Sequence, residues 1–110
     1  MVYKIVPGAL WRASESTGTF TGSPVDVLDG YIHLSTGQQV RETAARHFAG
    51  VDGLLLVAVA IGALDVRWEP SRDGDLFPHL YGSLPVSAVS WVVALPIGPD
   101  GRHAFPEYMP

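Results

Sequence analysis

Residues 30–38, GYIHLSTGQ, predict a strand followed directly by the start of a helix. In residues 30–34 (GYIHL), polar and apolar side chains alternate after a glycine, as in a strand with one face in the core. Residues 35–38 (STGQ) have the form of a capping box, in which a hydroxyl N-cap precedes a glutamine by three positions. We therefore expect a strand at 30–34, then a helix over 36–48 with its N-cap at Ser35.

An apolar stripe supports this helix, and a glycine ends it. The stripe consists of Val40, Ala44, Ala45 and Phe48, and the side of the helix that faces water carries Arg41, Glu42 and Arg46. The helix is expected to end at Gly50.

The segments on either side predict further strands. Residues 2–6 (VYKIV) are rich in β-branched and aromatic side chains, and Pro7 and Gly8 end them. Residues 54–61 (LLLVAVAI) lack polar alternation, which is typical of a strand covered on both faces. Weaker signals predict a short helix at 8–17, a loop around Gly18, Gly22 and Pro24, strands at 64–68, 77–82 and within 86–95, and a polar turn at 71–75.

These elements predict one α+β domain over residues 1–97, with two main helices and a loose tail over 98–110. A length of 110 residues suits a single domain.

Composition excludes several classes of function. Only 16% of residues are charged, the net charge is −4, and Lys4 is the single lysine. Generic nucleic-acid binding and attraction to a membrane surface both need a basic patch, so neither is expected. With no cysteine, disulfides and thiolate sites are excluded. The N-terminus does not resemble a signal peptide, and the longest apolar run, 54–61, is too short to span a bilayer, so we expect a cytoplasmic protein.

Several catalytic motifs are missing. A Walker loop, a G-x-G-x-x-G fingerprint and a G-x-S-x-G elbow do not occur. No two histidines have the spacing of a zinc motif, so a metal site would need the fold to bring together His33, Glu69 and His79. We expect no metal.

Three groups of polar and aromatic residues are candidates for chemistry. In the first, Tyr31, His33 and Ser35 share one face of the strand at 30–34, where they can bond to and stack on a flat ligand. Alternatively, His33 satisfies a buried backbone group and Ser35 only caps the helix.

The second group repeats this pattern, because His79 and Tyr81 also stand two residues apart. Histidine suits acid–base work or phosphate binding near neutral pH. The alternative is a rigid loop of aromatic residues and proline that packs over a sheet edge.

In the third group, Arg67 suits a phosphate, Trp68 offers a stacking surface, and Glu69 suits a ribose hydroxyl or a base. The alternative is a solvated Arg–Glu pair beside a core tryptophan.

The three groups, taken in order with residues 2–5 (VYKI), resemble a small bacterial family called domain of unknown function 952. The resemblance runs from about Val2 to Leu95. It implies a fold similar to that of ADP-ribosyltransferases and RNA 2′-phosphotransferases, namely a split β-sheet domain with a cleft between two small sheets.

By that resemblance, His33 and Ser35 line an NAD cleft, and residues 79–81 lie near the third motif position of those enzymes. Two departures are visible. Tyr3, Lys4 and Ile5 stand where those enzymes carry a His-Gly-Thr element, and Glu69 lies earlier than their glutamate.

Three hypotheses follow. The first is an enzyme that binds NAD or an ADP-ribose-like nucleotide and transfers or hydrolyses its ADP-ribosyl or phosphoryl group. His33, Glu69 and His79 would be catalytic, and the ligand contacts would come from Tyr31, Ser35, Arg67, Trp68 and Tyr81. The second is a binding module without turnover, which the two departures favour. The third is a self-associating interaction protein, such as a homodimer, which the high apolar content favours.

Overall fold

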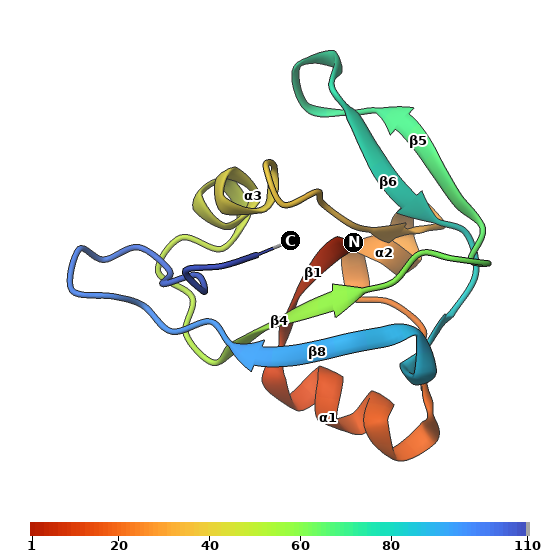
Figure 1. Cartoon of the computed structure of the whole chain (residues 1–110), viewed down its shortest axis with the longest axis horizontal. Coiled ribbons are helices and arrows are strands. Elements are labelled where there is room, and N and C mark those ends of the chain that lie inside the picture. The colour runs from red at the N-terminus through yellow and green to blue at the C-terminus, as the bar shows by residue number, and fades with distance from the viewer. Residues whose placement is uncertain (110) are drawn as a thin grey trace.

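Three short antiparallel sheets and three α-helices make up residues 1–109, the part of the chain that the computed structural model describes (Figure 1). The helices are α1 (Gly8–Thr17), α2 (Pro24–Asp29) and α3 (Val40–His47). The strands are β1 (Val2–Pro7), β2 (Thr19–Phe20), β3 (Ile32–His33), β4 (Leu54–Val59), β5 (Val66–Pro70), β6 (Leu76–Leu80), β7 (Leu84–Pro85) and β8 (Val89–Ala94).

The main sheet has the strand order β1-β4-β8, with β4 in the centre. Both partners run antiparallel to β4, and Val2 pairs with Val59 at one end of the β1–β4 ladder. The unbroken apolar run of β4 is covered on both faces, as its pattern predicted. The last strand lies within 86–95, as expected, and it begins at Val89, because Val86–Ala88 form a 3₁₀ turn.

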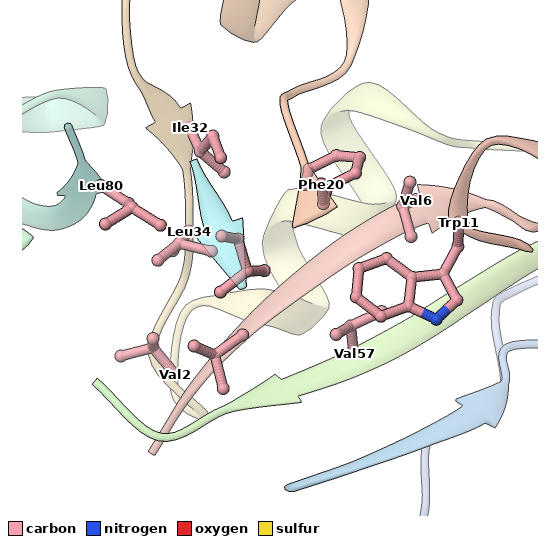
Figure 2. Close-up of a cluster of buried hydrophobic side chains, with 10 residues drawn as sticks. Val2, Val6, Trp11, Phe20, Ile32, Leu34, Val57 and Leu80 are labelled. Carbon is pink, nitrogen blue, oxygen red and sulfur yellow. The ribbon is translucent and has the colours of Figure 1, made fainter. Parts of the chain in front are cut away.

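Each face of the main sheet has its own core. On one face, Val2, Val6 and Val57 pack with side chains from α1 and from the two smaller sheets. Figure 2 shows that cluster, with Trp11 of α1 near Phe20 of β2. Its other members are Ile32, Leu34, Val59, Leu80 and Leu84. On the other face, the core consists of Tyr3, Ile5, Leu54, Leu56, Ala58 and Leu95 with Val40 and Ala44 of α3.

The sheet β3-β6-β5 is the part of the fold that positions the candidate site. Its strands pair antiparallel, and His33 lies opposite His79, which lies opposite Arg67. The predicted strand at 30–34 is shorter than expected, because only Ile32 and His33 form β3. Beyond it, Ser35 forms a bridge with Tyr3, which ties this sheet to β1.

That bridge also corrects the predicted start of α3. The N–H and C=O groups of Ser35 both bond to Tyr3, at 2.9 and 2.7 Å, so Ser35 stays extended and does not cap the helix. The reciprocal capping bonds occur one residue later, between Thr36 and Gln39, at 3.0 and 3.2 Å. Regular helix begins only at Val40.

The helix α2 was not predicted, so the expectation of two helices is wrong. Ser23 precedes it, Pro24 occupies its first turn, and the Asp26 carboxylate accepts a bond of 2.8 Å from the Ser23 N–H. Its apolar side chains, Val25, Val27 and Leu28, are exposed. Periodicity therefore could not reveal it, because a helix of six residues with no buried apolar stripe has no hydrophobic signal.

The segment after β8 turns back and contacts the rest of the fold. Ile97 forms a bridge with His103, and the chain then returns to the helix α3. There Phe105 and Met109 pack against the second core, and the Arg41 guanidinium lies 5.1 Å from the Phe105 ring centroid. None of the helices within residues 1–109 has both the length and the apolar character needed to cross a bilayer.

Candidate functional site

Most of the predicted site residues converge on one face of the β3-β6-β5 sheet. His33 comes from β3, His79 from β6 and Glu69 from β5, while Tyr31 precedes β3 and Tyr81 follows β6. We call these five residues the histidine cluster. They meet because residues two apart on a strand share a face, and the register places His33 opposite His79.

A carboxylate orients the His79 ring. Glu69 Oε1 lies 2.8 Å from His79 Nδ1 and accepts a bond of 2.7 Å from the Tyr81 hydroxyl. The Tyr81 hydroxyl, and after it the His79 ring, hold the pKa of Glu69 below its ordinary value. Because Glu69 is then an acceptor only, Nδ1 of His79 carries the proton, and Nε2 of the neutral ring carries the lone pair.

This Nε2 atom is free. It has no hydrogen-bond partner among residues 1–109, where Trp11 Nε1 is the one fully buried side-chain polar atom without a partner. Nε2 of His79 must therefore reach solvent, although the side chain is only 3% exposed. An imidazole with a fixed tautomer and an open nitrogen can act as a base, and it can donate to an anion once that nitrogen is protonated.

His33 is held differently, because carboxylates approach both of its ring nitrogens. Nδ1 lies 2.6 Å from Asp26 Oδ1, and Nε2 lies 2.9 Å from Asp29 Oδ2. Both ring nitrogens of His33 therefore face carboxylates of α2, and neither is left open to a ligand.

Asp26 is the buried anchor of this arrangement. Its carboxylate accepts bonds from the Lys4 ammonium at 3.0 Å and from the backbone N–H of His33 at 3.0 Å, besides the His33 ring. Burial raises the pKa of Asp26, but the bond from the His33 ring and the charge of Lys4 outweigh it and hold the pKa well below the ordinary value. Burial lowers the pKa of Lys4, and Asp26 opposes that change.

Aromatic rings pack around the two histidines. Tyr31 stacks on His79, with ring centroids 4.1 Å apart and planes at 27°, and its ring lies 4.6 Å from that of His33. The Arg67 guanidinium lies 4.3 Å from the Tyr81 ring centroid. Burial, and after it the charge of Asp29, raises the pKa of Tyr31, whereas the bond to Glu69 is the main cause of the raised pKa of Tyr81. Both phenols therefore stay neutral hydrogen-bonding groups.

A small pocket of about 90 Å³ opens beside the two histidines. Its polar lining consists of His33, Ser35, Thr43, His47, Ser71, Arg72 and His79. No carboxylate among residues 1–109 lines it. Every polar side chain around it is therefore a cation, an imidazole or a hydroxyl.

Arg72 lies on the connection between β5 and β6, on the same side of the molecule as α3 (Figure 1). Its side chain is 12% exposed, and its guanidinium lies 4.8 Å from the Phe77 ring centroid. Its polar contacts are long, 3.5 Å to Thr43 Oγ1 and 3.6 Å to Glu42 Oε2. Most of its five N–H donors thus remain available to a ligand.

Three predicted residues are placed outside the histidine cluster. Ser35 lines the small pocket, where its hydroxyl lies 3.0 Å from that of Thr43. Arg67 pairs with Asp65 at the surface, at 3.3 Å. Trp68 lies on the opposite face of β5 from Arg67 and Glu69 and is 45% exposed, so the fold does not bring it to the site. Within residues 1–109, no three histidine or acidic side chains are grouped so as to hold a metal.

Sequence reasoning missed six residues of the site: Lys4, Asp26, Thr43, His47, Ser71 and Arg72. Lys4 had a readable signal, because a charge in the middle of an apolar strand needs a buried partner. For Asp26, the signal was the serine and proline before it, which are typical of a helix start. No sequence signal indicated Arg72 or Thr43, since only the folded hairpin brings Arg72 to Thr43.

A second, larger hollow of about 670 Å³ lies between α3 and the C-terminal segment. Alanines of α3 and Phe105 line it, and its two arginines, Arg41 and Arg102, are matched by Asp100 and Glu107. None of the predicted site residues contributes to it.

Comparison with known proteins gives a family and a structural relative. The model of a family described as "Protein of unknown function (DUF952)" matches residues 5–92. The X-ray structure of protein CC0527 from Caulobacter crescentus is 46% identical, with a TM-score of 0.87 over 94% of this chain and 92% of that chain. The solution NMR structure of CC0527 is 48% identical, with a TM-score of 0.83 over 92% and 89%. No protein with curated annotation matches the chain.

Proposed function

The chain belongs to the DUF952 family, and we propose that its small pocket binds a phosphate group of a nucleotide of the NAD or ADP-ribose kind. The observation that carries this proposal is the lining of the pocket, whose polar side chains are Arg72, three histidines and three hydroxyls, with no carboxylate among the described residues in the lining itself. The carboxylates that pair with Arg72, His33 and His79 stand behind these side chains, outside the lining. Such a set of donors favours a bound anion, and arginine with imidazole suits a phosphate.

The size of the pocket limits what enters it. A volume of about 90 Å³ is well below the 300–1,000 Å³ of common small-molecule sites. It therefore takes one group of the ligand, and the rest must lie outside. The neighbouring Tyr31 and Tyr81 offer rings on which a base or ribose can pack.

His79 and Glu69 extend the proposal to chemistry. The Nε2 lone pair of His79 is the base available at this pocket, and Glu69 fixes its tautomer. In a transfer of an ADP-ribosyl or phosphoryl group, His79 would accept the proton of the attacking hydroxyl, and the Arg72 guanidinium would favour the negative charge of the ligand. If there is no turnover, the same groups only bind the ligand. This alternative is favoured because Tyr3, Lys4 and Ile5 stand where the similar enzymes carry a His-Gly-Thr element.

We also propose that the fold is a variant of the ADP-ribosyltransferase fold. Two observations support this: the order β3, α3, β4 along the chain, and the separation of the strands into small sheets with the histidines beside the junction. In that arrangement, Ser35 and His33 would face the ligand.

Thermal unfolding with and without NAD or ADP-ribose tests the proposal. A ligand at a hundred times its Kd adds about 2.7 kcal/mol to the free energy of unfolding, which raises the Tm of a domain of this size by several degrees. We expect that shift in the wild type and in His103→Gln, whose histidine lies outside the pocket, but not in His79→Gln. No shift in the wild type with either nucleotide would contradict the proposal. Release of nicotinamide from NAD then separates turnover from binding.

A second copy of the chain is the second candidate partner, because α2 exposes three apolar side chains. Val25, Val27 and Leu28 are 52%, 67% and 83% exposed. Light scattering tests this candidate: a dimer that Leu28→Glu converts to a monomer would support it, and a monomeric wild type would exclude it.

A further inference from the structure

We infer that the small pocket selects a terminal phosphate, a phosphate monoester, over the internal diphosphate or diester of a nucleotide. This inference rests on the proposed function and narrows it: among ADP-ribose-like nucleotides, those with a terminal phosphate bind most tightly, and NAD and ADP-ribose, whose phosphates are all internal, bind more weakly. It comes from the depth, the size and the charge of the pocket.

Depth is set by the residues that would bind the phosphate. The His79 side chain is 3% exposed and that of Arg72 is 12% exposed. The Tyr31 ring covers one face of the His79 imidazole, with centroids 4.1 Å apart, so the ring cannot turn outward. A phosphate must therefore enter the pocket to reach Nε2 of His79.

Size then distinguishes the two kinds of phosphate. A volume of about 90 Å³ admits a phosphoryl group and little else. A terminal phosphate has one substituent, which can leave through the mouth of the pocket. An internal phosphate has two, and both would have to leave through the same mouth, which holds the phosphorus atom away from His79.

Charge acts in the same direction. A monoester carries close to two negative charges near neutral pH, and a diester carries one. The pocket offers the N–H donors of the Arg72 guanidinium and the Nε2 atom of His79, which donates when that ring is protonated. The carboxylates that pair with Arg72, His33 and His79 lie outside the lining of the pocket. Because the stacked Phe77 and the Glu42 carboxylate already hold the Arg72 side chain, binding orders it at little further cost.

The test is calorimetric titration of the full chain with 5′-AMP, with the methyl ester of 5′-AMP, and with adenosine. We expect 5′-AMP to bind at least about tenfold more tightly than its methyl ester, as fits the loss of one hydrogen bond to a charged group. Adenosine should bind more weakly still.

Variants assign the preference to the pocket. Arg72→Gln and His79→Gln should each reduce the preference for the monoester to less than about threefold, because each removes one contact of the terminal oxygens. Arg12→Gln is the matched control, because Arg12 is an exposed residue of α1 that pairs with Glu15. It should keep the full preference. Near-ultraviolet circular dichroism checks that each variant is folded.

The outcomes separate this inference from the proposed function. If 5′-AMP and its methyl ester bind equally, or if NAD and ADP-ribose bind as tightly as 5′-AMP, nucleotide binding stands and the terminal-phosphate inference is wrong. If a preference exists but survives both Arg72→Gln and His79→Gln, the phosphate lies elsewhere and the inference is again wrong. If no nucleotide binds, the proposed function itself fails.

Discussion

Lys4 shows how a single residue links the core to the site. It lies in the middle of β1, whose neighbours on the same face, Val2 and Val6, belong to the first core. Its ammonium reaches the Asp26 carboxylate at 3.0 Å, and both side chains are almost fully buried. Asp26 in turn holds the backbone and the ring of His33. A buried ion pair adds little net stability over apolar packing, but it sets where the site residues lie.

We expect Lys4→Met to lower the free energy of unfolding by about 3–5 kcal/mol, because it leaves the Asp26 carboxylate buried without its cation. Urea denaturation measures this change. Arg12→Met removes an exposed charge from α1 and should change the free energy by no more than about 0.5 kcal/mol. A loss under about 1 kcal/mol in Lys4→Met would show that Asp26 does not depend on Lys4.

At the same scale, Glu69→Gln tests how the His79 ring is oriented. The glutamine amide can donate as well as accept, so it no longer requires the proton at Nδ1 of His79. We expect nitrogen-15 spectra of the side chain to show a mixture of the two tautomers in Glu69→Gln and the Nδ1–H form alone in the neutral wild-type ring. Glu15→Gln, an exposed change on α1, is the control. A single, unchanged tautomer in Glu69→Gln would mean that another group orients the ring.

Among the elements, those with a buried apolar pattern could be predicted and those held by polar contacts could not. The patterns of β1 and β4 were sufficient, because both lie in the middle of the two cores. By contrast, α2 is held by Pro24, by the Ser23–Asp26 bond and by the Lys4 ion pair. The start of α3 was displaced by the Ser35–Tyr3 bridge, which is a contact between distant parts of the chain.

Gly22 tests how tightly α2 approaches the chain before it. Its φ is 117°, and a Cβ atom there would lie 2.9 Å from the Cβ of Asp26. Gly18 also has positive φ, 83°, but its Cβ would meet nothing within 4 Å. We expect Gly18→Ala to cost about 1–2 kcal/mol from backbone strain alone. Gly22→Ala should cost about 1–3 kcal/mol more, since Asp26 must also move. Equal losses in chemical denaturation would mean that α2 adjusts freely.

For the whole molecule, the buried Asp26 carboxylate predicts a dependence of stability on pH. Its folded pKa lies below the ordinary value of 3.8, so its contribution is present above that pH and is lost as the pH falls through the folded pKa. We expect the wild-type Tm to fall steeply below about pH 4. Asp26→Asn should be less stable at neutral pH and should show a shallower fall. Parallel curves for the two proteins would show that Asp26 is not ionised in the fold.

The site as a whole could be predicted only in part, because local patterns show which side chains share a strand face but not which distant segments meet. Residues two apart on one strand gave the pairs Tyr31 with His33 and His79 with Tyr81, and the fold brings both pairs together. The pattern also placed Trp68 with Arg67 and Glu69, although neighbours on a strand face opposite ways. Arg72 enters through the turn of a hairpin, and no local pattern reveals which side chain such a turn will place over a pocket.

The most direct measurement follows the side-chain nitrogens of the four histidines by NMR during titration with ADP-ribose and with 5′-AMP. We expect the Nε2 signal of His79 to move on saturation with at least one of them, while the signal of His103 Nε2, which is bonded to the carbonyl of Val51, stays in place. If a nucleotide binds and the His79 signal does not move, or if neither nucleotide binds, the small pocket is not a nucleotide-binding site.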